Sequence, residues 1–113
     1  QPYLRFPGDN EQAKSCQSLG IKTDYLRLVK QGMVAACSPG GTGTAFFDSP
    51  FSVGCKTGTA EVGDGSSDTH AWFTVFAPAE NPTIVLTVFL ERGGSGAYEA
   101  GPIAKEILSE YLK

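Results

Sequence analysis

A lysine, two threonines and a glycine stand together at Lys56, Thr57, Gly58 and Thr59. These residue types suit the binding of a carboxylate, because the ammonium supplies a point charge and the hydroxyls donate hydrogen bonds. The run lies in a β-patterned segment, so Thr57 and Thr59 are expected on one face of a strand. Gly58 lets another chain approach the backbone closely. The run therefore predicts one wall of a site for a carboxylate-bearing peptide.

The motif is expected on the first of three consecutive strands, residues 52–60, 70–77 and 83–91, which are rich in aromatic and β-branched residues. A Gly/Asp/Ser-rich loop at 62–69 and a Pro-bounded turn at 78–82 join them, so neighbouring strands are predicted to be antiparallel. The third strand is almost continuously apolar, which predicts cover on both faces of the sheet.

Two helices are predicted to flank the strands. The first starts at Thr23 or Asp24, either of which could cap it, and stops at residues 38–41. Its apolar stripe is interpreted as core, and Gly32 within it indicates close packing. The second helix runs from residue 97 or 98 to Lys113. The predicted fold class is α+β: a helix, a three-stranded antiparallel sheet and a C-terminal helix.

Composition narrows the function classes. A chain of 113 residues with 41% hydrophobic content is large enough for one small domain or part of a larger one. Residues 1–22 are expected to be an irregular N-terminal segment, and residues 23–113 to form the folded unit. A net charge of −3 argues against a nucleic-acid partner. No apolar run approaches the roughly 20 residues of a membrane span.

Cysteine and histidine content predicts no metal site. Cys16, Cys37 and Cys55 form no Cys-x-x-Cys pair, and His70 is the single histidine. A Cys16–Cys37 disulfide is an alternative in an oxidising compartment, but three unpaired thiols are favoured, with Cys55 facing the core. No cofactor is expected either, since the Gly-rich run at 40–45 is not followed by the Gly-Lys-Ser/Thr of a phosphate loop.

The motif and several runs that follow it carry a family resemblance through their order and spacing. These are Lys56-Thr57-Gly58-Thr59, then His70 to Pro82 with its Ala71-Trp72-Phe73, the apolar run 83–91, and Gly101-Pro102-Ile103-Ala104. Together they resemble the C-terminal part of the transpeptidase domain of class B penicillin-binding proteins, over roughly residues 24–113. Ala71-Trp72-Phe73 is more similar to the cell-elongation type than to the division type. The fold implied is part of the serine β-lactamase/transpeptidase-like fold.

The resemblance also implies roles. Lys56 would add positive potential beside the nucleophile, Thr57 and Thr59 would hold the carboxylate of a stem peptide or β-lactam, and Gly58 would leave room. The Thr59 N–H resembles one oxyanion-hole donor. Thr42 and Thr44 would lie beneath the site floor.

The nucleophile is missing from the chain. The family's Ser-x-x-Lys and Ser-x-Asn motifs occur nowhere in the sequence, so no catalytic residue is assigned. The chain is therefore interpreted as a fragment of a serine-type D,D-transpeptidase that cross-links peptidoglycan, inactive alone. The alternative is a non-catalytic secreted module that binds a carboxylate or peptide.

Partners and location follow from the fragment hypothesis. The remainder of the transpeptidase domain is the expected partner. An open, apolar edge at 83–91 predicts self-association. The parent is expected at the extracytoplasmic face of the bacterial cell membrane, with its anchor upstream.

Overall fold

A computed structural model describes residues 18–113 and gives an α+β fold, as predicted. The elements are α1 (Thr23–Ala36), η1 (Thr44–Phe46), β1 (Gly54–Glu61), β2 (Thr69–Ala77), β3 (Ile84–Leu90), η2 (Gly96–Ala100) and α2 (Gly101–Tyr111). Most of the predicted irregular segment 1–22 lies outside the described residues. No described helix has the length and apolar character needed to cross a bilayer.

The three strands form one antiparallel sheet in the order β1-β2-β3, which confirms the predicted topology. Thr57 of β1 lies opposite Phe73 of β2, and Phe73 lies opposite Val88 of β3. Residues 78–82 close the second turn, where the Thr83 N–H donates to the Ala77 carbonyl at 2.9 Å. The sheet therefore presents β1, which carries the motif, as one edge and β3 as the other.

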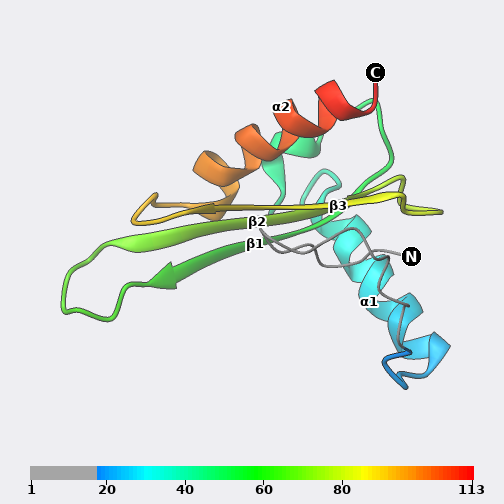
Figure 1. Ribbon diagram of the computed structural model, residues 1–113, viewed down its shortest axis with the longest axis horizontal. Coiled ribbons are helices and arrows are strands. Elements are labelled where there is room, and N and C mark those ends of the chain that lie inside the picture. Colours follow the sequence, from blue (N-terminus) through cyan, green and yellow to red (C-terminus); the bar gives the residue numbers. More distant parts are fainter. Residues whose placement is uncertain (1–17) are drawn as a thin grey trace, which may run out of the picture.

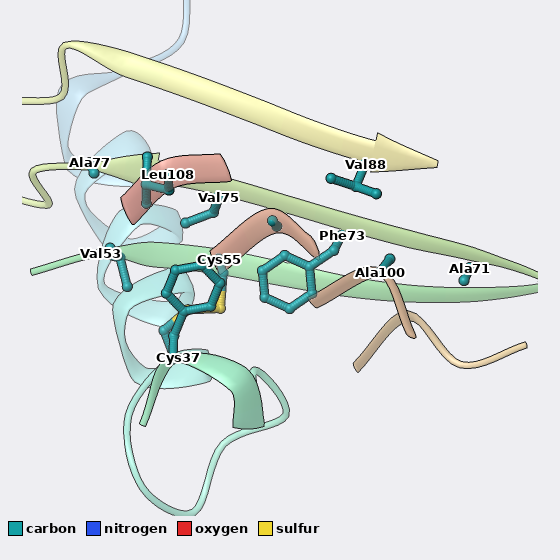
Figure 2. Packing of buried hydrophobic residues seen from close by; sticks show 12 residues of the cluster. Cys37, Val53, Cys55, Ala71, Phe73, Val75, Ala77, Val88, Ala100 and Leu108 are labelled. Carbon is teal, nitrogen blue, oxygen red and sulfur yellow. A yellow bond between two sulfur atoms is a disulfide. The ribbon is translucent and has the colours of Figure 1, made fainter. Parts of the chain in front are cut away.

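The core lies between the sheet and α2, which runs across one face (Figure 1). Phe73 and Val75 of β2 are fully buried there, together with Leu108 of α2 (Figure 2). Phe46 of η1 stacks on Phe73 with 5.5 Å between ring centroids. Alternation along the strands thus directs one set of side chains into a core built with α2 and η1.

The opposite face of the sheet is uncovered over its centre. This uncovered face carries Trp72, Val85 and Phe89, which are 42%, 47% and 46% exposed. Trp72 and Phe89 are cross-strand partners with ring centroids 4.3 Å apart. The prediction of cover on both faces of the third strand is therefore wrong for the described residues, because α2 packs on one face only.

Helix α1 has the predicted start and stop but not the predicted burial. It begins at Thr23 without a side-chain capping hydrogen bond, and its N-cap residue is Lys22, so the predicted Thr or Asp cap is wrong. No residue of α1 is buried, and Gly32 has no atom near enough to touch an added Cβ. The helix projects away from the sheet and meets the rest of the described chain mainly near its C-terminal end (Figure 1). The core interpretation of its stripe is therefore wrong within residues 18–113. Its exposed apolar side chains are Tyr25, Leu26, Leu28 and Val29.

The segment after β3 differs from the predicted single helix. A π-helical turn, η2, comes first, and α2 follows with Pro102 in its first turn. The two elements are continuous, since Ala100 and Gly101 both have helical backbone angles and the Gly101 N–H donates to the Gly96 carbonyl. The Ser95 side chain accepts a hydrogen bond from the Tyr98 N–H and so caps η2.

Candidate functional site

The motif residues occupy the middle of an edge strand. Lys56, Thr57, Gly58 and Thr59 all lie on β1, which has β2 on one side and no strand of residues 18–113 on the other. The register places Thr57 and Thr59 opposite Phe73 and Ala71, so the two hydroxyls share one face of the strand, as predicted. That face is the α2 side of the sheet. Lys56 and Gly58 are on the other side.

Lys56 is exposed, and its ammonium donates a hydrogen bond to the Thr57 carbonyl oxygen. No salt bridge to it occurs among the described residues. The Lys56 charge therefore stands at the edge of the sheet, available to an anionic ligand.

Thr57 is supported by the loop that follows α1. Its Oγ1 donates to Thr42 Oγ1 at 3.2 Å. Thr42 thus lies against the motif, where the resemblance placed it. Thr44 instead begins η1, and its side chain makes no hydrogen bond with β1 in the described chain. Of the two threonines singled out in this loop, one contacts the motif.

The Thr59 side chain is held by a different element, η2. Its Oγ1 accepts a hydrogen bond from the Gly96 N–H at 3.2 Å. Because that bond uses a lone pair of the oxygen, the hydroxyl proton of Thr59 remains free to be donated to a ligand. The Gly96 contact was not predicted from the sequence, and the only signal for it is the Gly-rich run before α2.

Two glycines allow close packing around the backbone of the motif. An added Cβ at Gly58 would lie 3.0 Å from the Trp72 Cβ on the neighbouring strand. At Gly96 it would lie closer than 3.0 Å to the carbonyl oxygens of Gly58 and Trp72, a separation that real Cβ atoms essentially never show. The start of η2 therefore rests directly on the backbone of the sheet beside the motif.

The loop between β1 and β2, residues 62–68, is tied to the end of β3. The Arg92 guanidinium forms ion pairs with Asp64 and, at 2.7 Å, with Asp68. A hydrogen bond from the Ser66 hydroxyl, followed by one from Arg92, lowers the pKa of Asp64 to about 2. The Arg92 N–H donates to His70 Nδ1 at 3.1 Å. His70 is thus a structural acceptor here.

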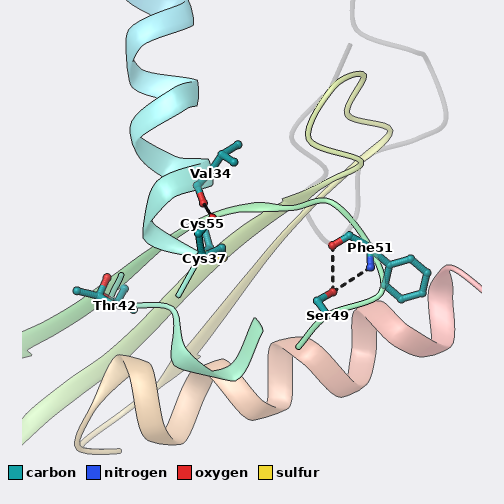
Figure 3. The surroundings of a disulfide bond; sticks show 8 residues. Val34, Cys37, Thr42, Ser49, Phe51 and Cys55 are labelled. Carbon is teal, nitrogen blue, oxygen red and sulfur yellow. Dashed lines mark hydrogen bonds between the residues drawn. A yellow bond between two sulfur atoms is a disulfide. The ribbon is translucent and has the colours of Figure 1, made fainter. Parts of the chain in front are cut away.

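Cys37 and Cys55 form a disulfide, which corrects the prediction of three unpaired thiols (Figure 3). It also excludes a Cys16–Cys37 pair, since Cys37 is already bonded. The two Cα atoms are 5.6 Å apart although 18 positions separate them in the chain. The chain that follows α1 folds back along β1 and brings the two cysteines together. The spacing of the cysteines in the sequence does not reveal that path. Cys55 is fully buried, so the prediction that it faces the core is confirmed.

The arrangement has groups suited to an anionic ligand, but it lacks the nucleophilic serine of an acyltransferase. The sequence has no Ser-x-x-Lys, and the described residues contain no group of His, Cys, Asp and Glu that could hold a metal ion. What the site offers is a cation, two oriented hydroxyls and a strand edge that no strand of residues 18–113 pairs with. A groove of about 930 Å³ lies behind Thr42, lined by α1, residues 38–42, Ala79 and Glu80, and it does not include Lys56.

Comparison with known proteins assigns the chain to a family. The family model described as "Penicillin binding protein transpeptidase domain" matches residues 4–113. The chain belongs to the penicillin-binding protein transpeptidase family. The resemblance inferred from Lys56-Thr57-Gly58-Thr59 and the runs after it is therefore confirmed.

Similar penicillin-binding proteins are much longer than this chain. Peptidoglycan D,D-transpeptidase MrdA of Haemophilus influenzae is 37% identical over 106 residues, which cover 80% of this chain and 16% of MrdA. The chain thus spans about one sixth of that curated relative.

Two solved penicillin-binding proteins share the fold. PBP2 of Helicobacter pylori, solved in complex with MreC, has a TM-score of 0.69 and 30% identity, and the match covers 79% of this chain and 17% of PBP2. Penicillin-binding protein A of M. tuberculosis, solved as an imipenem acyl-enzyme complex, has a TM-score of 0.59 and 27% identity over 82% of this chain and 20% of that one.

Proposed function

We propose that this chain is the substrate-binding wall of a D,D-transpeptidase that cross-links peptidoglycan through an acyl-serine intermediate. In this proposal Lys56, Thr57, Gly58 and Thr59 bind the carboxylate of a stem peptide or β-lactam, and residues 23–113 are the C-terminal subdomain. The observation that carries the proposal is the pair of hydroxyls on one face of an edge strand, each held by a second contact, Thr42 for Thr57 and Gly96 for Thr59.

Each motif residue has a distinct part in this proposal. The two hydroxyls donate to the carboxylate oxygens, and these bonds are stronger than neutral ones because the acceptor is ionised. Lys56 adds a positive charge at the same strand edge. The Thr59 N–H is one oxyanion-hole donor for the carbonyl under attack. Such a donor accelerates acylation only when the nucleophile and carbonyl are both in place. The chain alone is therefore proposed to be inactive.

The remainder of the transpeptidase domain is the partner that completes the site. Two observations support this: the apolar stripe of α1 and the uncovered face of the sheet are both exposed here. Burying such side chains is favourable by about 25 cal/mol per Å² of apolar area. A second domain half that covers both surfaces would also bring the nucleophile to Lys56.

The parent protein is proposed to be of the elongation type, anchored in the membrane with this domain on the extracytoplasmic side. The H. influenzae relative named MrdA and the H. pylori PBP2 solved with MreC support this subtype. The acyl-enzyme complex of the M. tuberculosis protein with imipenem supports covalent β-lactam binding by the parent protein.

The test is acylation by a fluorescent penicillin, followed by intact mass spectrometry. We expect no adduct on the 113-residue chain and one adduct on the full-length product of its gene. Thr57→Val in that product should slow acylation about tenfold or more, as loss of a hydrogen bond to a charged group implies. Lys56→Ala should do at least as much, and Lys113→Ala, which removes another exposed lysine, should not.

The alternative of a non-catalytic carboxylate-binding module makes the opposite prediction. A full-length gene product that lacks Ser-x-x-Lys and takes no penicillin adduct, yet still binds a D-alanyl-D-alanine peptide through Lys56, would replace the transpeptidase proposal. An adduct on the 113-residue chain itself would refute the claim that it is inactive alone.

A further inference from the structure

The disulfide joins two elements that form the candidate site. Cys37 is the C-cap residue of α1, and Cys55 directly precedes Lys56 on β1. Both are buried, so the bond lies inside the junction between helix and strand (Figure 2). Cys55 and Thr57 are two positions apart and therefore share one face of β1. The bond is thus next to Thr57 on that face.

The loop formed by residues 38–43 packs directly on this bond. An added Cβ at Gly43 would lie closer than 3.0 Å to Cys55 Sγ and 3.1 Å from Cys37 Sγ. The Gly43 N–H donates to the Ala36 carbonyl at 2.7 Å. Gly41 is as tightly placed, against the Ala36 carbonyl. The path of the 38–43 loop therefore depends on where the two sulfur atoms are.

Thr42 lies between these two glycines and is the residue that contacts the motif. Its Oγ1 is 3.2 Å from Thr57 Oγ1, and Figure 3 shows it on the loop that leads away from the disulfide. Hydroxyl protons rotate to suit their partners. When Thr57 donates to a bound carboxylate, Thr42 can donate to Thr57 in turn. A continuous set of contacts thus runs from the disulfide through Gly43 and Thr42 to Thr57.

We propose that the Cys37–Cys55 disulfide is a positioning device for carboxylate binding, one that makes the affinity of the site depend on redox state. With the bond intact, the 38–43 loop is held against β1 and Thr42 orients the Thr57 hydroxyl. With the bond reduced, the loop separates from β1 and Thr57 loses that support. Binding weakens while the acylation step itself is spared. This inference rests on the proposed function, because it names what regulates the same site.

A dithiol reductant such as dithiothreitol can reduce the Cys37–Cys55 bond. The reductant supplies two electrons and two protons and becomes a cyclic disulfide. The S–S bond breaks, and Cys37 and Cys55 each become a thiol. The double variant Cys37→Ala/Cys55→Ala gives the same unlinked state without a reductant. Cys16→Ala removes a cysteine that is not part of this bond and serves as its control.

The first measurement is made on the 113-residue chain and needs no activity. Peptide mapping without reductant should find the peptides of Cys37 and Cys55 linked. Hydrogen exchange followed by mass spectrometry should then become faster in residues 38–47 and 54–61 after reduction, with α2 unchanged. Unlinked peptides, or uniformly faster exchange over the whole chain, would overturn the inference whatever the protein does.

The second measurement separates binding from chemistry in the full-length gene product. For β-lactam acylation, reduction or the double alanine variant should raise the dissociation constant about fivefold to tenfold, the effect of one neutral hydrogen bond such as that between Thr42 and Thr57. The first-order acylation rate constant should change less than about twofold. Cys16→Ala should leave both constants unchanged. An equal loss in both constants, or none in either, would contradict a positioning role.

Variants at Thr42 test the last contact. With the disulfide intact, Thr42→Val should reproduce the rise in dissociation constant, and Thr42→Ser should restore affinity because it keeps the hydroxyl. Thr87→Val is the matched control, since Thr87 shares a hydroxyl hydrogen bond with Thr74 at 2.9 Å on the face of the sheet opposite to Thr57. Absence of acylation in the oxidised wild type would count against the proposed function, and the exchange data would still decide the role of the disulfide.

Discussion

Gly96 is a residue whose lack of a side chain the site requires. It contacts the backbone of Gly58 and Trp72, and its N–H holds the Thr59 hydroxyl. Gly96→Ala should destabilise the chain by about 1–3 kcal/mol, because the new methyl group forces η2 away from the sheet. Urea unfolding followed by circular dichroism measures the change.

Gly32→Ala is the matched control on α1. Gly32 has open space around it, so alanine should raise the free energy of unfolding by about 0.5–1 kcal/mol through helix propensity alone. Equal effects of the two variants would show that Gly96 does not contact the sheet as described.

At the scale of elements, ion pairs between Arg92 and two aspartates hold the β1–β2 loop in place. Hydrogen bonds from Ser66 and Arg92 lower the pKa of Asp64 from 3.8 to about 2. The folded state therefore binds this proton less tightly than the unfolded chain. Ionised Asp64 favours folding above about pH 4, and this contribution is lost as the pH falls through about 2.

Carboxyl ¹³C NMR should give an Asp64 midpoint near 2 in the wild type. Arg92→Gln should raise the midpoint part of the way toward 3.8, because the hydrogen bond from Ser66 remains. A wild-type midpoint already at 3.8 would show that the loop is not held by these contacts in solution.

Sequence patterns predicted the elements better than their contacts. The strands were found within two residues of their bounds, because alternation and turn residues are local signals. The Cys37–Cys55 bond and the Thr59–Gly96 contact join residues far apart in the chain, so no local signal reports them. The stripe of α1 was identified correctly, but its burial depends on a surface that residues 18–113 do not supply. Similarly, Ile103 and Ile107 of α2 are exposed, whereas Ala104 of the same helix is buried.

For the whole molecule, we expect self-association through β3. This strand is an edge of the sheet, and its Phe89 is 46% exposed. Unpaired backbone groups beside apolar side chains favour pairing with a second chain. Sedimentation velocity at rising concentration should show a dimer or larger species. Phe89→Lys should shift the equilibrium toward monomer through charge repulsion across the pair.

Tyr98→Lys is the control for that variant. Tyr98 is an aromatic residue of η2 and is 70% exposed. Its replacement also removes an exposed ring and adds a charge, but away from β3, so association should not change. A wild-type chain that stays monomeric at every concentration would refute association through this edge.

The pair of Trp72 and Phe89 on the uncovered face has a spectroscopic consequence. Trp72 is the single tryptophan of the chain, and nearly half of it is in contact with solvent. Indole emission shifts to shorter wavelength when the ring leaves water. Intrinsic fluorescence therefore reports, without a label, the moment when another domain half or a second copy covers this face. Docking on the side of α2 would leave that signal unchanged.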